Sequence, residues 1–387
     1  MLRPMTAVLL SASLLLTACA GSSGTPDPYA DPAGTAPVPL TAAETTATFS
    51  ATVSGTPDAQ GLLTVNVPGF VDASGNVVKN LGKSNFTVIE DGKLKGFTAA
   101  AATTSSSIPT DIVFVFDTTG SMASQIRGVA SSIVAFSKTL ETSGLDVHLG
   151  AVTFGDAFDT VDAPTSVTGG VALGRPGIPP GFDTDERPTL PLTDDFDAFR
   201  TFIGSNTARD GQDSAENAPG ALNFAYGSMA WRPGAARVLI VITDVYQHQA
   251  GALGAIPVSS RWAPPSMTAL LTTLKGRATV HVIGPDMSGY DITPYADMKD
   301  LTGPAGTGGV FIDLATGLTS TALSNRGRAT PTLSTLDLDL TKLPIQTVLA
   351  NAYTIRYRGT KTGGTHTLRL RIESGGIRGE TTVTTTY

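Results

Sequence analysis

The sequence predicts an α/β fold, in which a central, mostly parallel sheet is inserted in or flanked by an antiparallel β-sandwich-like domain. Three features of its 387 residues support this. Residues 112–116 are all apolar, which is typical of a strand buried on both faces. Apolar runs then alternate with segments of helical spacing along the middle of the chain. Both flanks instead alternate apolar and polar residues, as half-buried antiparallel strands do.

The middle of the chain yields its strands and helices in order. The continuous apolar run predicts a strand at 112–116, and further strands are predicted at 145–154, 238–242, 279–283 and 310–312. Apolar residues at helical spacing predict helices near 126–140, 196–203, 218–230 and 266–274. Because strands and helices alternate, we expect a parallel sheet that is covered by helices on both sides.

The two flanks are predicted to pair with each other. Residues 63–67 and 86–90 read as strands before the α/β region, and residues 353–357, 368–372 and 380–386 read as strands after it. Each flank alone has too few strands to bury a face. We therefore expect one β domain made from 45–108 and 331–387, with the α/β domain at 109–330 inserted between its two parts.

The N-terminus has the pattern of a lipoprotein signal. Arg3 precedes an apolar run over 7–16 that is too short to span a bilayer as a mature helix. Leu16-Thr17-Ala18-Cys19 resembles the lipobox of bacterial lipoproteins, whose cysteine is acylated. We expect a signal peptide at 1–18, lipidation of Cys19 and a flexible tether at 19–44. The protein would then lie in the cell envelope outside the cytoplasm, anchored to the outer membrane or cell surface.

Composition excludes several classes of protein. Hydrophobic residues make up 41% of the chain, which is enough for a buried core and excludes a mainly disordered protein. The net charge of −7 argues against binding to nucleic acid. The single cysteine excludes an intrachain disulfide and a zinc site built on cysteines.

Three polar segments are predicted at the carboxyl ends of strands, where open α/β sheets place their ligands. The first is Asp117-Thr118-Thr119-Gly120-Ser121, the second spans 210–217, and the third is Thr243-Asp244. Their side chains offer oxygen atoms, which suit hard cations such as Mg²⁺, Ca²⁺ or Mn²⁺. Taken alone, Asp117 could instead cap the helix that follows it.

These segments resemble the metal-ion-dependent adhesion site of the von Willebrand factor A family. Asp117, Thr119 and Ser121 match the family's Asp-x-Ser/Thr-x-Ser motif, and Asp244 matches the acid of its third loop. The resemblance covers about 111–317 and implies a Rossmann-like fold. It also implies that Thr119 and Ser121 bind one Mg²⁺, or Ca²⁺ or Mn²⁺, with the acids contributing directly or through water.

The second segment is similar to that of integrin β-subunit domains. Asp213-Ser214-Ala215-Glu216 resembles their Asp-x-Pro-Glu sequence, although Ala215 replaces the proline. The likeness implies that Glu216 binds the same cation and that Asp213 serves a further one. The alternative is that Glu216 is an ordinary acid in the first turn of a helix, where it complements the helix dipole.

The resemblance implies a binding protein rather than an enzyme, with a partner Asp or Glu as the last ligand of the cation. One alternative is a structural envelope protein whose cation stabilises the fold. Another is a phosphotransferase, because residues 117–121 also resemble the aspartyl-phosphate signature Asp-Lys-Thr-Gly-Thr. That signature has lysine where this chain has Thr118, and no acidic Gly-Asp-Gly-x-x-Asp loop follows.

Overall fold

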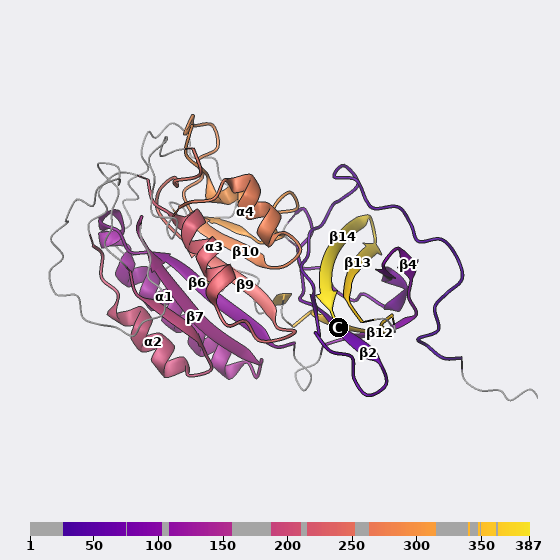
Figure 1. Cartoon of the computed structure of the whole chain (residues 1–387). Helices are drawn as coiled ribbons and strands as arrows, with labels where there is room; N and C mark the ends of the chain where they lie inside the picture. Colours follow the sequence, from indigo (N-terminus) through magenta and orange to yellow (C-terminus); the bar gives the residue numbers. More distant parts are fainter. Residues whose placement is uncertain are drawn as a thin grey trace, which may run out of the picture.

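The computed structural model describes residues 26–74, 76–102, 108–156, 187–209, 215–251, 263–314, 340, 347–348, 350–360 and 363–387. The signal peptide, Cys19 and Asp213 lie outside these residues, so the expectations about them stay predictions. An α/β unit lies beside a unit of antiparallel strands, and the two correspond to the middle and the flanks of the chain (Figure 1).

Within the described residues, the central sheet has six strands in the order β11-β10-β9-β6-β7-β8. They are β6 (Thr110–Asp117), β7 (Val147–Phe154), β8 (Thr189–Thr193), β9 (Ala236–Ile242), β10 (Thr279–Gly284) and β11 (Phe311–Asp313). Neighbouring strands pair in parallel, except β7 and β8, which are antiparallel. The predicted fold class is therefore confirmed.

Helices cover both faces of this sheet (Figure 1). They are α1 (Ile126–Thr142), α2 (Phe196–Ser205), α3 (Ala218–Ser228) and α4 (Met267–Leu274). Ile112, Phe114 and Phe116 of β6 pack in one apolar cluster with α1 and α2, whereas Val113 and Val115 pack in another with α3 and α4. Because successive side chains of a strand point to opposite faces, a strand covered on both sides is apolar at every position.

The flanks form two antiparallel sheets in the described residues, in the orders β1-β2-β12-β5 and β14-β13-β3-β4. Their N-terminal strands are β1 (Thr52–Val53), β2 (Leu62–Val67), β3 (Phe86–Glu90), β4 (Lys93–Leu94) and β5 (Phe97–Ala101). Their C-terminal strands are β12 (Tyr353–Arg358), β13 (Thr365–Ser374) and β14 (Ile377–Thr386). Since β12 lies between β2 and β5, and β13 pairs with β3, each sheet contains strands from both flanks. One apolar cluster fills the space between the sheets.

The sandwich contacts the edge of the central sheet at which the parallel strands begin. Asn66 Nδ2 and Thr52 Oγ1 each donate to the carbonyl of Gly234, at 2.8 Å, just before β9. The backbone N–H of Ala51 donates to the carbonyl of Gly276, just before β10, at 3.1 Å. The opposite edge, where the parallel strands end, therefore points away from the sandwich (Figure 1).

Residues 26–44, which we predicted as part of a flexible tether, lie along the surface of the sandwich (Figure 1). Asp27 forms an ion pair with Arg358, and Asp31 forms one with Lys95, both at 2.9 Å. The composition of the segment is that of a linker, but its acids meet basic side chains from strands distant in sequence. Composition alone does not reveal such partners, so the structure differs here from a free tether.

The buried His281 of β10 predicts a pH-dependent loss of stability. Its Nδ1 accepts a hydrogen bond from the Val310 N–H at 3.0 Å, and burial lowers the pKa of the ring from 6.5 to about 4. The unfolded chain therefore binds this proton first, and stability falls as pH decreases from 6.5 through 4. This difference between the two pKa values lowers the free energy of unfolding by about 3 kcal/mol once the pH is below 4.

We expect His281→Gln to remove the loss of stability that protonation of His281 causes. The free energy of unfolding in urea should then decline less between pH 7.5 and 5 than in the wild type. The wild type should lose roughly 2 kcal/mol from this histidine over that range. The same decline in both proteins would show that His281 does not carry the effect.

Candidate metal centre

The first and third polar segments meet at the carboxyl edge of the central sheet. Asp117 is the last residue of β6, and Asp244 follows the neighbouring β9 by two residues. The chain leaves β6 toward β7 on one side, while β9 and β10 lie on the other, so this is the switch point of the sheet. A short 3-10 helix, η2 (Gly120–Ser124), places Thr119 and Ser121 beside the two aspartates.

Two sets of hydrogen bonds and one close contact between hydroxyl oxygens bring these four side chains together. Thr119 donates to Asp117 Oδ1 through both its backbone N–H, at 2.9 Å, and its hydroxyl, at 2.7 Å. The Ser121 hydroxyl donates to Asp244 Oδ1 at 2.9 Å. Between the two pairs, Thr119 Oγ1 lies 3.1 Å from Ser121 Oγ. The predicted residues Asp117, Thr119, Ser121 and Asp244 are thus brought together.

The contact between the two hydroxyls is favourable to a cation. Each hydroxyl has a single hydrogen, and these hydrogens are donated to the carboxylates of Asp117 and Asp244. The two oxygens therefore present lone pairs to each other at 3.1 Å. Adjacent ligands about 2.1 Å from an octahedral cation lie about 3.0 Å apart, close to this separation. The donor set consequently fits a Mg²⁺-like ion bound by Thr119 and Ser121.

Burial makes it unfavourable for the carboxyl groups of Asp117 and Asp244 to be ionised at the same time. The pKa of Asp117 is raised by burial, against the lowering effect of its hydrogen bonds and of the buried Arg187. The pKa of Asp244 is raised to about 7, first by burial and then by the charge of Asp117. A divalent cation favours the ionised form of nearby acids, so its binding would relieve this cost.

Glu216 lies near this edge, beside the third segment. Its N–H donates to the carbonyl of Tyr246 at 3.4 Å, its carbonyl accepts from the His248 N–H at 2.7 Å, and it is 3% exposed. No cluster of three His, Cys, Asp or Glu side chains suited to a metal occurs in the described part of the chain. The donors that the structure brings together are therefore two carboxylates and two hydroxyls, while Glu216 as a ligand remains a prediction.

Two side chains behind the centre were not identified as functional from the sequence. The hydroxyl of Thr243 donates to Asp117 Oδ2 at 2.8 Å. The side-chain amide of Gln247 donates to Thr243 Oγ1, also at 2.8 Å. Thr243 stands in the third segment, but nothing in the residue pattern marks Gln247, because its role depends on the path of the loop after Asp244.

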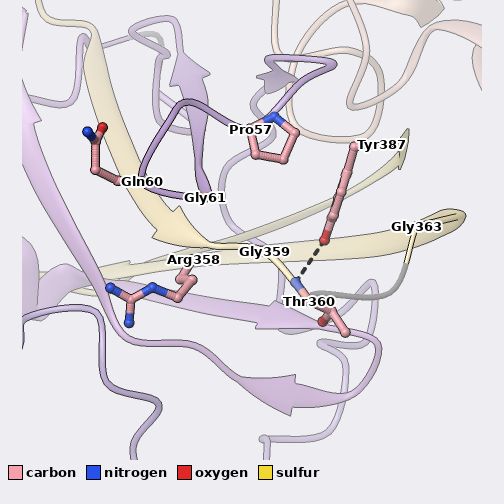
Figure 2. Close-up of a pocket in the computed structure, with 8 residues that line it drawn as sticks. All are labelled: Pro57, Gln60, Gly61, Arg358, Gly359, Thr360, Gly363 and Tyr387. Atoms are coloured by element: carbon pink, nitrogen blue, oxygen red, sulfur yellow. Dashed lines mark hydrogen bonds between the residues drawn. The ribbon is translucent and has the colours of Figure 1, made fainter.

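A pocket of about 630 Å³ opens in the sandwich rather than at this edge (Figure 2). The Tyr387 hydroxyl on its wall accepts from the Thr360 N–H at 3.0 Å and donates to the buried Glu90 at 2.6 Å. The residues that line the pocket are Pro57, Gln60, Gly61, Arg358, Gly359, Thr360, Gly363 and Tyr387. None of these is acidic, so the pocket lacks the carboxylates that a second cation site would need.

No protein-family model matches the chain, and no curated protein matches its sequence. Among solved structures, the chain is similar to the conserved hypothetical protein BatB from Bacteroides thetaiotaomicron, with 19% identity and a TM-score of 0.28. That similarity covers 49% of this chain and 77% of the other.

The chain is also similar to proximal thread matrix protein 1 from the mussel byssus, whose structure has a zinc-occupied MIDAS motif. The identity is 14% and the TM-score 0.35, over 69% of this chain and 50% of the mussel protein, so the chain spans about half of that protein. Both similarities are weak, and the fold class and the candidate metal centre rest on the strands and side chains of this chain.

Proposed function

We propose that this protein is a lipid-anchored envelope protein, not an enzyme, that binds an acidic protein partner through a divalent cation at this centre. The observation that carries the proposal is the pair of hydroxyl oxygens of Thr119 and Ser121. Both lie at cation-ligand separation, with both hydrogens held by carboxylates. The resemblance to the adhesion site of von Willebrand factor A domains supports the same function.

The choice of ligands explains why a partner would bind. When bound, the cation supplies a centre of positive charge that attracts a carboxylate. Thr119 and Ser121 hold it through neutral oxygens and so leave much of its charge uncompensated. A carboxylate of the partner would then supply a further oxygen donor beside Thr119 and Ser121. Asp117 and Asp244 orient the two hydroxyls and add negative charge nearby.

The proposed anchor agrees with the arrangement of the two units. Asp27 and Asp31 tie the start of the described chain to the sandwich, and the metal centre lies at the opposite edge of the α/β unit. A lipid at Cys19 would therefore place the sandwich toward the membrane and the metal centre toward a partner. No helix in the described ranges is long and apolar enough to cross a bilayer.

The proposal predicts that partner binding depends on the cation. Full-length protein, immobilised and exposed to cell-envelope extract, should retain a partner in Mg²⁺, release it in chelator and retain it again when Mg²⁺ is restored.

Mass spectrometry of the mature N-terminus should show acylated Cys19, and Cys19→Ser should lose membrane attachment.

Circular dichroism in chelator is the control, because the apolar sheet should remain folded without the cation. A partner that binds equally well in chelator would favour the structural alternative. A wild-type protein that takes up no divalent cation at millimolar concentration would refute the metal centre itself. An N-terminus that is unmodified, or that begins elsewhere, would refute the lipid anchor.

A further inference from the structure

Gln247 lies fully buried behind the metal centre and joins three parts of the α/β unit. Its Nε2 donates to Thr243 Oγ1 at 2.8 Å and to the Val245 carbonyl at 2.7 Å. Its Oε1 accepts from the Ala218 N–H, in the first turn of α3, at 2.8 Å. Its backbone exchanges two hydrogen bonds with Ala296, in the segment that follows β10.

We propose that Gln247 is a positioning residue of the metal centre, which fixes the direction of hydrogen bonding at Asp117 and thereby raises cation affinity. This inference rests on the proposed function, because it concerns the same cation. Gln247 does not touch the proposed ligand oxygens of Thr119 and Ser121 and acts through Thr243.

The direction of hydrogen bonding follows from the partners of the amide. The Val245 carbonyl can only accept and the Ala218 N–H can only donate, so the nitrogen and oxygen of the Gln247 amide have one consistent assignment. Thr243 Oγ1 must therefore accept from Gln247, and its single hydrogen is left for Asp117 Oδ2.

The direction of the hydrogen bond from Thr243 to Asp117 affects the Thr119 hydroxyl on the other side of Asp117. With Oδ2 of Asp117 held by Thr243, Oδ1 faces Thr119 and receives that residue's hydroxyl hydrogen. The lone pairs of Thr119 then remain available to a cation. Without the amide of Gln247, nothing fixes the direction of the Thr243 hydroxyl, and its hydrogen bond to Asp117 weakens. Replacing such outer-shell partners costs about 10–100-fold in metal affinity.

Gln249 provides a matched control in the same loop. Its Nε2 donates to the carbonyls of Pro294 and Tyr295, both at 3.0 Å, and its Oε1 accepts from the Met267 N–H at 3.3 Å. The Gln249 side chain therefore ties the loop after β9 to the segment after β10 and to the start of α4, whereas the Gln247 side chain ties that loop to α3. Gln249 has no bond to Thr243, so its replacement tests loop tethering without disturbing the bonds at Asp117.

The test measures Mg²⁺ binding to the purified full chain by calorimetry, and thermal unfolding in chelator. Gln247→Met and Thr243→Val should each bind Mg²⁺ at least about tenfold more weakly than wild type, and Gln249→Met within about threefold of it. The double variant Thr243→Val/Gln247→Met should bind Mg²⁺ no more weakly than the weaker-binding single variant. Both changes break the same relay, which is the pair of hydrogen bonds from Gln247 to Thr243 and from Thr243 to Asp117. Unfolding in chelator separates this effect from a structural one, since Gln249→Met should lower the midpoint without changing cation affinity.

Three results would overturn the inference while wild type binds Mg²⁺: unchanged affinity in Gln247→Met, an equal loss in Gln249→Met, or losses that add in the double variant. If Gln247→Met does not fold, Thr243→Val decides alone, because it breaks the same relay by removing one hydroxyl. Wild type that binds no Mg²⁺ would instead refute the proposed function, and this inference with it.

Discussion

Replacing Asp117 with asparagine is expected to weaken Mg²⁺ binding by at least about 100-fold and to abolish cation-dependent partner binding. Asparagine has the shape of aspartate, and its oxygen can still accept from Thr119. Its NH₂ group cannot accept the hydrogen that Thr243 donates to Oδ2 in the wild type. The variant also removes a full negative charge from a buried site, where charges interact strongly.

Asp286 offers a matched control for this prediction. It is also a buried aspartate that follows a parallel strand at the same edge of the sheet, but its carboxylate pairs with Lys299 at 2.7 Å. Asp286→Asn should therefore bind Mg²⁺ within about threefold of wild type, since its carboxylate is not joined to Thr119 or Ser121. Calorimetry measures the affinity, and circular dichroism verifies the fold. Wild-type affinity in Asp117→Asn would exclude Asp117 from the metal centre.

The strands that position Asp117 could be predicted because they are buried on both faces. In β6 and β9 almost every residue must be apolar, and a continuous apolar run is visible in the sequence without knowledge of its neighbours. The same holds for the position of Asp117 and Asp244, because polar residues that directly follow such runs lie at the carboxyl edge of the sheet.

Edge strands were harder to predict. β8 contains Pro191, and we predicted no strand there from the sequence; proline is compatible with a strand mainly at a sheet edge. β5 includes Ala99 to Ala101, where we predicted no strand from the sequence. Alanine has a low intrinsic preference for strands, and here the pairing with β12 determines the conformation.

Contacts between distant segments explain what else the sequence did not reveal. Gln247 and Thr243 act on Asp117 across more than 120 positions, through a loop whose path no local pattern encodes. The ion pairs of Asp27 and Asp31 with the sandwich likewise join segments far apart. A motif identifies residues whose chemistry is conspicuous, whereas these partners are ordinary residue types in particular places.

The second large effect is expected at the other edge of the central sheet, at the ion pair of Arg232 and Asp111. Asp111, at the start of β6, is fully buried. Its Oδ1 accepts from Arg232 Nε at 2.6 Å, and its Oδ2 accepts from the Arg232 backbone N–H at 2.7 Å. Arg232 also donates to the Thr110 carbonyl at 2.9 Å. These bonds fasten the loop before β9 to the first strand of the sheet.

We expect Arg232→Met to lower the free energy of unfolding by about 3–5 kcal/mol, measured in urea at neutral pH. Methionine retains much of the apolar stem but removes the guanidinium, so the buried carboxylate of Asp111 keeps its backbone partner and loses its countercharge. Arg200 is the control, because its ion pairs with Glu141 and Asp197 involve exposed acids on the helices. Arg200→Met should cost no more than about 1 kcal/mol.

A second substitution shows whether Arg232→Met loses stability because the charge of Asp111 is unpaired or because packing is lost. If the unpaired charge of Asp111 is responsible, Asp111→Asn/Arg232→Met should be more stable than Arg232→Met, because asparagine is neutral and can still accept the Arg232 backbone N–H. A double variant that is less stable than Arg232→Met would show instead that the two residues contribute independently. The cation should still bind to Arg232→Met while the variant remains folded, since the ion pair lies at the edge of the sheet opposite Asp117.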